Sequence, residues 1–249
     1  MKTQYLFQNK KGRDFVCGDI HGCFGLLEKK LLEANFNPQL DRLFSVGDII
    51  DRGTNSQAAL HFLKQNWFHC IRGNHEQMLL DWCTENTPAF RNDAFRFHMN
   101  NGGIWVADYL GVHIQKLAED ILLVEPIVDR YPALSHWIDA IEKLPFAIEI
   151  KSAGKKFGIV HAEIPMQVKW PSLEAELNKT SVKYSILYSR KYIRSSKRKK
   201  YRIKGVDEVY CGHTIVETPQ KIGNINYIDT GAFSNKNLTL VELKGLGNK

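Results

Sequence analysis

Three junctions of one kind constrain this chain more than any other feature. Each has a short apolar run, a glycine, side chains of the kinds that bind metals, and then a helical pattern. The three are Gly18-Asp19-Ile20-His21-Gly22, Gly47-Asp48-Ile49-Ile50-Asp51-Arg52-Gly53 and Arg72-Gly73-Asn74-His75-Glu76. Asp19 and Asp48 are 29 residues apart and Asp48 and Asn74 are 26 apart, close to the roughly 30 residues of a βαβ unit. The spacing predicts neighbouring parallel strands whose carboxyl ends lie together, where open α/β sheets hold their sites.

Two later apolar runs end in histidine. Residues 157–160 lead into His161, and residues 209–211 lead into Gly212-His213-Thr214. We expect these two strand ends to lie in the same sheet as the first three. A single Gly-Asp or histidine at such a place is usually a capped turn or a core residue, but five in one sheet favour a metal site. The set contains oxygen and nitrogen ligands and no thiolate, which suits Mn, Fe or Zn.

The side chains at these ends are enough for a dinuclear metal centre. The ligands expected for one metal are Asp19, His21 and Asp48. Those expected for the other are Asp48, Asn74, His161 and His213, so that Asp48 bridges. Two cations about 3.5–4 Å apart can clamp an in-line displacement at phosphorus and lower the pKa of a bound water to about 7. The pattern therefore predicts a hydrolase that needs no protein nucleophile.

Taken together, these motifs resemble the PPP family of metallophosphoesterases, and their details are similar to the bacteriophage lambda-type and bacterial serine/threonine protein phosphatases. The similarity continues through Asn101-Gly102-Gly103 and Tyr227-Ile228-Asp229-Thr230-Gly231-Ala232, and it is weakest over 104–145 and 166–204. It implies an α/β fold of metallophosphoesterase type, a β-sandwich of mixed sheets flanked by helices. It also implies one calcineurin-like domain over 1–249, with a helical insertion at about 85–145 and an irregular basic segment at about 166–204.

The resemblance also assigns roles to individual residues. His75 corresponds to the general acid that protonates the leaving alcohol, and Asp51 orients it. Arg52 and Arg190 correspond to the arginines that bind phosphate, for which a bidentate guanidinium is well suited. The metals would be Mn²⁺, or Fe or Zn, and hydroxide on them would attack the phosphomonoester directly. The implied substrates are proteins or peptides phosphorylated on serine or threonine.

Two other functions remain open, one because of the charge distribution and one because of the family resemblance. The net charge is +7, yet residues 190–204 contain nine Lys or Arg and no acid, so the rest of the chain carries −2. Such a run is usually a solvated loop, and a rim of Lys197 to Lys200 would attract acidic phosphoproteins. A nucleic-acid-binding protein is one alternative, with Tyr184, Tyr188, Tyr192 and Tyr201 as the bases' stacking partners. The other is a symmetrical dinucleoside polyphosphate hydrolase, since that branch of the family is similar.

The remaining features point to a cytoplasmic protein without a membrane partner. No apolar run approaches the roughly 18 residues of a spanning helix, and residues 1–13 lack a signal region. Five cysteines fit no zinc pattern, so we expect buried reduced thiols. Histidines 61, 69, 98, 113 and 136 lie in no motif, and we expect them to be structural. Asp229 is either a neighbour of the ligands or a turn residue, and the sequence leaves the oligomeric state open.

Overall fold

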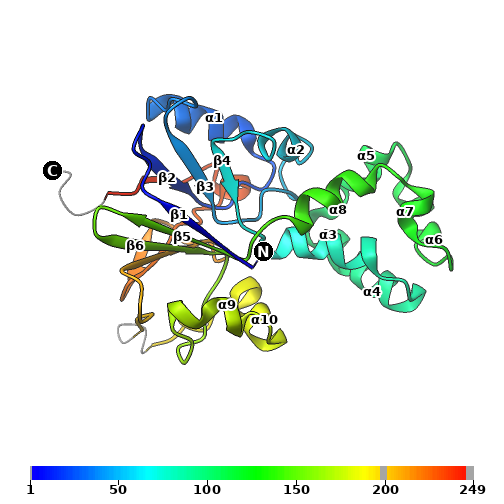
Figure 1. Ribbon diagram of the computed structural model, residues 1–249. Helices are drawn as coiled ribbons and strands as arrows, with labels where there is room; N and C mark the ends of the chain where they lie inside the picture. The colour runs from blue at the N-terminus through cyan, green and yellow to red at the C-terminus, as the bar shows by residue number, and fades with distance from the viewer. Residues whose placement is uncertain (1, 197–200, 245–249) are drawn as a thin grey trace.

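The computed structural model describes residues 2–196 and 201–244 and contains two β-sheets between helices (Figure 1). The smaller sheet has the order β10-β2-β3-β4, with strands β2 (Asp14–Cys17), β3 (Arg42–Ser45), β4 (Phe68–Cys70) and β10 (Leu240–Glu242). Strands β2, β3 and β4 are parallel, whereas β10 is antiparallel to β2. The prediction that the first three junctions follow neighbouring parallel strands is therefore confirmed.

The larger sheet has the order β1-β5-β6-β7-β9-β8 and is mixed. Its strands are β1 (Thr3–Phe7), β5 (Ala147–Ser152), β6 (Lys155–Val160), β7 (Glu208–Cys211), β8 (Gln220–Ile222) and β9 (Ile225–Tyr227). Because β6 and β7 belong to it, the expectation of one sheet for all five junctions is wrong. The chain leaves the smaller sheet after β4 and returns to it only with β10. The sandwich of mixed sheets implied by the resemblance is the observed fold.

Helices cover both outer faces of the sandwich and extend from one side of it as an arm (Figure 1). Those on the smaller sheet are α1 (Phe24–Glu33) and α2 (Ala58–Phe62). The arm comprises α3 (Asn74–Thr84), α4 (Pro88–His98), the π-helical turn η1 (Met99–Gly103), α5 (Trp105–Leu110), α6 (Ile114–Asp120), α7 (Ile127–Arg130) and α8 (Leu134–Glu142). The larger sheet is covered by η2 (Trp170–Ser172), α9 (Leu173–Glu176) and α10 (Thr180–Tyr188), and α11 (Ala232–Asn235) precedes β10.

Strand alternation explains why the sheets pack in layers. Successive side chains of a strand point to opposite faces, and in β2 Phe15 and Cys17 join the core under the helices while Val16 joins the core between the sheets. Phe44 of β3 and Ile148 of β5 meet Val16 there. All of these side chains are at most 3% exposed. The two sheets are thus held in register by a dry apolar layer, which also fixes how their strand ends face each other.

Three local expectations differ from the structure. The sequence predicts no strand before residue 15, but Thr3–Phe7 forms β1, which pairs in parallel with β5. Residues 100–103, expected to be a turn, form a π-helical turn in which Gly102 has a φ of +108°. A Cβ at Gly102 would meet the backbone of Arg52 at 2.8 Å. The segment at 166–204, expected to be irregular apart from one helix near 181–193, contains η2 and α9 as well as α10, because apolar side chains such as Trp170 and Val182 pack on the larger sheet.

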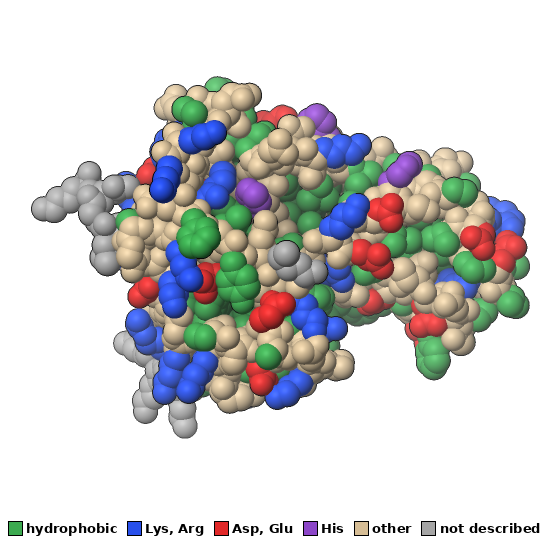
Figure 2. Space-filling view, in the orientation of Figure 1, with side chains coloured by type: hydrophobic (Ala, Val, Ile, Leu, Met, Phe, Trp, Pro, Cys, Tyr) green, Lys and Arg blue, Asp and Glu red, His purple; other side chains and the backbone are tan. Residues whose placement is uncertain are grey.

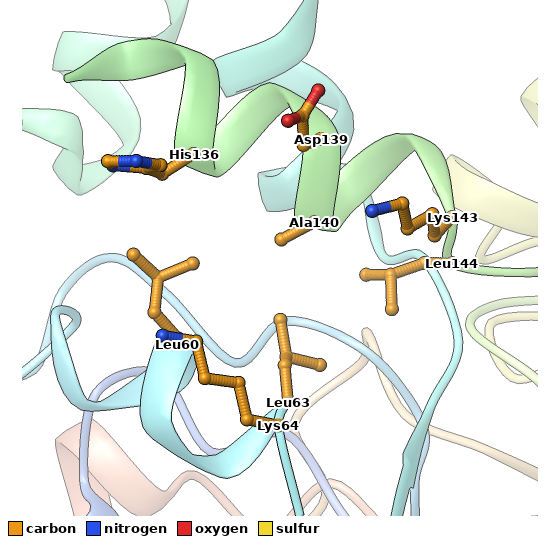
Figure 3. A pocket seen from close by; sticks show the side chains of 8 residues that line it. All are labelled: Leu60, Leu63, Lys64, His136, Asp139, Ala140, Lys143 and Leu144. Carbon is orange, nitrogen blue, oxygen red and sulfur yellow. The ribbon is translucent and has the colours of Figure 1, made fainter.

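The arm contacts the body across a groove between α2 and α8 (Figure 3). Leu60 of α2 and Leu63 just after it face Ala140 of α8 and Leu144 just after that helix, and the groove has a volume of about 420 Å³. Hydrophobic side chains are visible in this region between body and arm (Figure 2). None of the predicted site residues lines the groove. Within the described ranges, no helix is long and apolar enough to cross a membrane.

Candidate metal centre and active site

The five junction loops bring their side chains into one cluster at the ends of the strands of both sheets. The six predicted ligands, all buried, are Asp19, His21, Asp48, Asn74, His161 and His213. Three of them, His21, Asp48 and His213, have left-handed backbones with φ of 46°, 50° and 65°. Such conformations cost about 1–3 kcal/mol each and persist where the surrounding structure imposes them. The fold therefore holds these side chains in place against local strain.

A buried carboxylate in α3 fixes the loop that carries Asp48. Glu76 accepts hydrogen bonds from the backbone N–H groups of Asp48 (2.9 Å), Ile49 (2.8 Å) and Gly73 (2.8 Å). It thereby ties the β3 junction to the β4 junction. Residue 73 must be glycine, because a Cβ there would collide with Asp48 Oδ1. Asp48 is thus positioned from both neighbouring strands.

Asp48 lies at the centre of two clusters of ligand atoms. The two groups whose atoms lie within 4.8 Å of one another are His21, Asp48 and His75, and Asp48, His161 and His213. In the first, His21 Nδ1–H donates to the Ile50 carbonyl (2.9 Å), so its Nε2 carries the lone pair, 3.6 Å from Asp48 Oδ2 and 3.2 Å from Arg52 Nη1. Burial lowers the pKa of His21 to about 3. Its neutral form is the one that binds metals.

Three acceptor atoms converge in the second cluster. Asn74 Oδ1 lies 2.8 Å from His161 Nε2 and 2.8 Å from His213 Nδ1. The other ring nitrogens are occupied, since His161 Nδ1–H donates to the Val46 carbonyl (2.8 Å) and His213 Nε2–H to the Tyr188 carbonyl (3.1 Å). In the neutral form in which histidines bind metals, the two imidazole lone pairs face one amide oxygen. A divalent cation resolves this arrangement, so the donor set fits a metal.

The buried carboxylates give a second argument for cations. Burial, with Asp229 and Asp48 beside it, raises the pKa of Asp19 well above its usual value. Burial also acts to raise the pKa of Asp48, yet the histidines around it, His161 first, hold it well below its usual range. Asp19 lies outside both compact clusters, and its oxygens accept the His213 N–H at 3.0 and 3.2 Å. Bound cations relieve repulsion between like charges of this kind.

A separate hydrogen-bonded network leads to His75. Asp51 Oδ2 accepts from His75 Nδ1–H (2.6 Å) and His98 Nε2–H (2.8 Å), and its Oδ1 accepts from Trp105 Nε1–H (2.6 Å). Trp82 Nε1–H donates to His98 Nδ1 (2.9 Å), which fixes the tautomer of His98, because an indole N–H can only donate. Although burial opposes it, His98 and His75 hold the pKa of Asp51 well below its usual value.

The free nitrogen of His75 points at the metal cluster. His75 Nε2 is buried and has no hydrogen-bond partner, and it lies 3.8 Å from Asp48 Oδ2. Its ring packs edge-on against that of His21, with centroids 4.7 Å apart. An orphaned nitrogen in a dry site is costly unless a ligand uses it. The geometry leaves His75 Nε2 able to hold a proton or to bind a metal.

The two predicted phosphate-binding arginines reach the cluster from different segments. Arg52 Nη1 lies 3.2 Å from His21 Nε2, and its guanidinium lies 4.8 Å from the centre of the Phe233 ring. Arg190 Nη2 donates to the His213 carbonyl (3.2 Å). Burial first, and then the nearby Arg194 and Arg52, lower the pKa of Arg190. The structure thus brings together cations suited to an anion beside the ligand groups.

The family match covers most of these elements. A family model described as calcineurin-like phosphoesterase matches residues 15–217, a range that includes every ligand named above. The chain belongs to the calcineurin-like phosphoesterase family. It is therefore a metallophosphoesterase, a family that uses divalent metals, and it offers two groups of candidate ligands for them.

Similar proteins agree with this assignment. The phosphoesterase is 31% identical over 248 residues to serine/threonine-protein phosphatase 1 of Salmonella typhimurium, covering 98% of this chain and 100% of that one. A symmetrical bis(5'-nucleosyl)-tetraphosphatase of Glaesserella parasuis is 41% identical over only 68 residues, 26% of this chain and 25% of that one. A serine/threonine phosphatase structure from Saccharomyces cerevisiae shares the fold, with a TM-score of 0.58 at 14% identity over 99% of this chain and 85% of that one.

Sequence reasoning missed several residues of the phosphoesterase site. His98, expected to be structural, lies directly beside the predicted site and donates a hydrogen bond to Asp51. Trp105 also binds Asp51, and both flank the Asn101-Gly102-Gly103 motif, which was the available signal. Glu163, two residues after His161, accepts hydrogen bonds from the N–H groups of residues 192 and 193. No sequence pattern marked Glu163.

Three other features of the phosphoesterase were left open or set aside by the sequence. Asp229 accepts the Gly231 N–H (2.9 Å) and also lies beside Asp19, so it is both a turn residue and a neighbour of the ligands. Arg72 donates to Gln77 and to carbonyls at the end of α8, which makes it structural. The predicted rim of Lys197 to Lys200 lies outside the described residues.

Proposed function

We propose that this chain, as a single domain over 1–249, hydrolyses phosphomonoesters on phosphorylated serine or threonine residues of proteins. The observation that carries the proposal is the convergence of two ligand clusters on Asp48 with the free nitrogen of His75 beside them. Support for protein substrates comes from the relative named serine/threonine-protein phosphatase 1, which matches along its whole length. The tetraphosphatase relative matches over only a quarter of its own length, so it gives weaker support for hydrolysis of dinucleoside polyphosphates.

The proposed metal ligands are the six predicted ones, with Asp48 shared. Mn²⁺ is the metal we expect, with Fe or Zn as alternatives that the oxygen and nitrogen donors also suit. When bound, two such cations supply Lewis acidity that activates water and neutralises phosphate oxygens. The chain's own residues must then bind and orient the ester. Arg52 and Arg190 do so by donating to the phosphate oxygens from two sides, which stabilises negative charge as it develops.

His75 is the proposed proton donor to the leaving alcohol. Asp51 accepts the Nδ1 proton at 2.6 Å, so the proton that His75 can give away is the one on Nε2, the nitrogen that faces the cluster. Three donors to Asp51 keep that carboxylate ionised and fix its orientation. The imidazole ring is therefore aimed before substrate binds, as general acid catalysis requires.

His98 is a positioning residue in this scheme, and its replacement gives a prediction. His98→Leu removes one donor to Asp51 and leaves the Trp82 N–H unsatisfied, so His75 is held less firmly. We expect kcat for a phosphoserine peptide to fall about 10-fold, the scale of a lost outer partner. The loss should be smaller for nitrophenyl phosphate, whose leaving group needs little protonation. His98→Gln, whose amide can donate to Asp51 and accept from Trp82, should recover most of the activity.

These kinetics separate positioning from a purely structural role of His98. A lower melting temperature with equal losses on both substrates would mean that His98 only stabilises the fold. Unchanged kinetics in His98→Leu would mean that Trp105 and His75 suffice to orient Asp51.

The function itself is tested by comparing three substrates in the presence of Mn²⁺. They are a phosphoserine peptide, a phosphotyrosine peptide and diadenosine tetraphosphate. We expect kcat/KM to be highest for the phosphoserine peptide. A preference for diadenosine tetraphosphate would establish the dinucleoside polyphosphate activity instead, and a preference for phosphotyrosine would change the substrate class. Binding of duplex DNA without turnover of any of the three would favour the nucleic-acid alternative.

A further inference from the structure

A hollow of about 320 Å³ lies directly beside the proposed metal centre and is lined by cations. Its walls are Tyr188, Ser189, Arg190, Lys191 and Arg194. Two of these residues touch the ligand His213, because the Tyr188 carbonyl accepts its Nε2–H (3.1 Å) and Arg190 donates to its carbonyl (3.2 Å). The hollow therefore shares a wall with the centre. An anion bound at the metals would lie next to it.

Arg190 and Arg194 occupy one face of a single turn. The Arg194 N–H donates to the Arg190 carbonyl (3.2 Å), which closes the turn and places the two side chains four residues apart. Like charges at this spacing are neighbours and repel each other. The turn thus carries an unfavourable cluster of positive charge.

No carboxylate in the described part of the chain forms an ion pair with Arg190, Lys191 or Arg194. Some arginines elsewhere in the described chain are paired with carboxylates, whereas others, such as Arg96 and Arg202, are not. Arg13 binds Asp41 at 2.7 Å, and Arg42 binds Asp14 at 2.8 Å. The cations beside the centre differ from these structural pairs, since their partners are not supplied by the described fold.

The turn that holds these cations is firmly anchored. Glu163, 1% exposed, accepts hydrogen bonds from Ser189 Oγ (2.9 Å), from the Ile193 N–H (3.0 Å) and from the Tyr227 hydroxyl (2.8 Å). The Tyr192 N–H also donates to it, at 2.9 and 3.0 Å. The segment on both sides of Arg190 is thereby fixed to Glu163 and, through Tyr227, to strand β9 of the larger sheet. An uncompensated cluster on a fixed backbone is preorganised for an anionic ligand.

We propose that Lys191 and Arg194 form a second anion subsite, which binds another phosphoryl or carboxylate group of the same substrate while Arg190 and Arg52 hold the reacting phosphate. This rests on the proposed function, and it narrows the substrate class to phosphoproteins with an acidic or second phosphorylated side chain close to the scissile phosphate. Direct contact of this kind gives charge-assisted hydrogen bonds, which are stronger than neutral ones.

The test compares two phosphoserine peptides that differ only in a neighbouring residue, glutamate in one and glutamine in the other. We expect the wild type to prefer the glutamate peptide about 10-fold in kcat/KM, the scale of a hydrogen bond between charged groups. Arg194→Gln should reduce this ratio to about 2. The double variant with Lys191→Gln should show no preference, which is a ratio of about one. The ratio is internal to each variant, so it does not depend on general losses of activity.

The matched control is Arg202→Gln. Arg202 lines a different hollow, together with Lys156, Lys204 and Asp207, and its replacement changes the net charge by the same amount. We expect the Arg202→Gln ratio to equal that of the wild type. An equal fall in both single variants would mean long-range steering and would overturn the subsite. The subsite would also be overturned if the wild type showed a ratio of one, or if Arg194→Gln left the ratio unchanged.

Direct binding separates failure of the subsite from failure of the proposed function. The probes are the same two peptides with a non-hydrolysable phosphonate, titrated calorimetrically into the metal-loaded protein. A wild type that turns over neither peptide refutes the protein-phosphatase proposal. The calorimetric ratio then still decides the subsite, because tighter binding of the glutamate probe that is lost in Arg194→Gln supports it and equal binding refutes it.

Discussion

His75→Asn is expected to lower kcat for a phosphoserine peptide by about 10²–10⁴, the range that a positioned general acid contributes, while the protein keeps both metals. The physical reason is the orphaned Nε2, which faces the ligand cluster while Nδ1 is committed to Asp51. Asparagine cannot supply that proton. Because nitrophenolate leaves without protonation, the loss on nitrophenyl phosphate should be much smaller.

Metal content decides between the two roles that the geometry allows His75. Its nitrogen belongs to one of the two compact ligand clusters, so loss of one metal equivalent in His75→Asn would identify it as a ligand. Equal losses on the two substrates would also contradict the acid role. His61→Asn is the matched control, since His61 is exposed in α2 and its side chain interacts with Gln65 and Phe62, away from the metal cluster. Its kinetics and metal content should equal those of the wild type.

Asp48→Asn is expected to abolish hydrolysis and to lower the content of both metals, because Asp48 is the residue common to the two clusters. Replacing its carboxylate by an amide removes the negative charge that the surrounding histidines stabilise. Chelation of the wild type should have the same effect on activity, and Mn²⁺ should restore it. Ligands that bind only the folded state stabilise it, by about 2.7 kcal/mol at 100 times Kd. The melting temperature of the wild type should therefore rise with Mn²⁺, and that of Asp48→Asn should rise much less.

Asp93→Asn provides the comparison for this variant, since Asp93 is exposed on α4 and forms no ion pair within residues 2–196 and 201–244. It should respond to Mn²⁺ as the wild type does. Full activity after verified removal of all metal would refute the two-metal proposal outright.

The sequence is informative wherever the chemistry follows the strand ends directly. Glycine, ligand and helix recur at βαβ spacing, so the residue pattern alone places the junctions at Asp19, Asp48 and Asn74 side by side. His161 and His213 can be assigned to the same site, but not to the correct sheet. Their strands follow the helical arm, and after such a long insertion the sequence spacing no longer indicates which strands are neighbours. The contact between the two sheets is determined by the apolar layer between them.

The supporting residues could not be predicted, because their contacts depend on tertiary packing. His98 and Trp105 lie 47 and 54 residues from Asp51, on an arm without strand periodicity. Glu163 accepts hydrogen bonds from the backbone of Tyr192 and Ile193, which lie 29 and 30 residues further along the chain. Single buried polar side chains of this kind leave no period in the sequence, whereas their burial and hydrogen bonds are evident in the structure. Whether Arg194 has a carboxylate partner also depends on tertiary packing, so the run of basic residues in the sequence could not show that the described structure supplies none.

The division of the ligands between two sheets makes the distance between those sheets a property of the active site. Asp48 and Asn74 extend from one sheet and His161 and His213 from the other, and catalytic constellations tolerate displacements of only about 0.5 Å. Substitutions in the apolar layer, at Phe44 or Ile148 for example, touch no ligand, yet they change how the two halves of the centre meet. If the proposed ligands hold the metals, the packing of the sandwich interior sets metal affinity as well as stability.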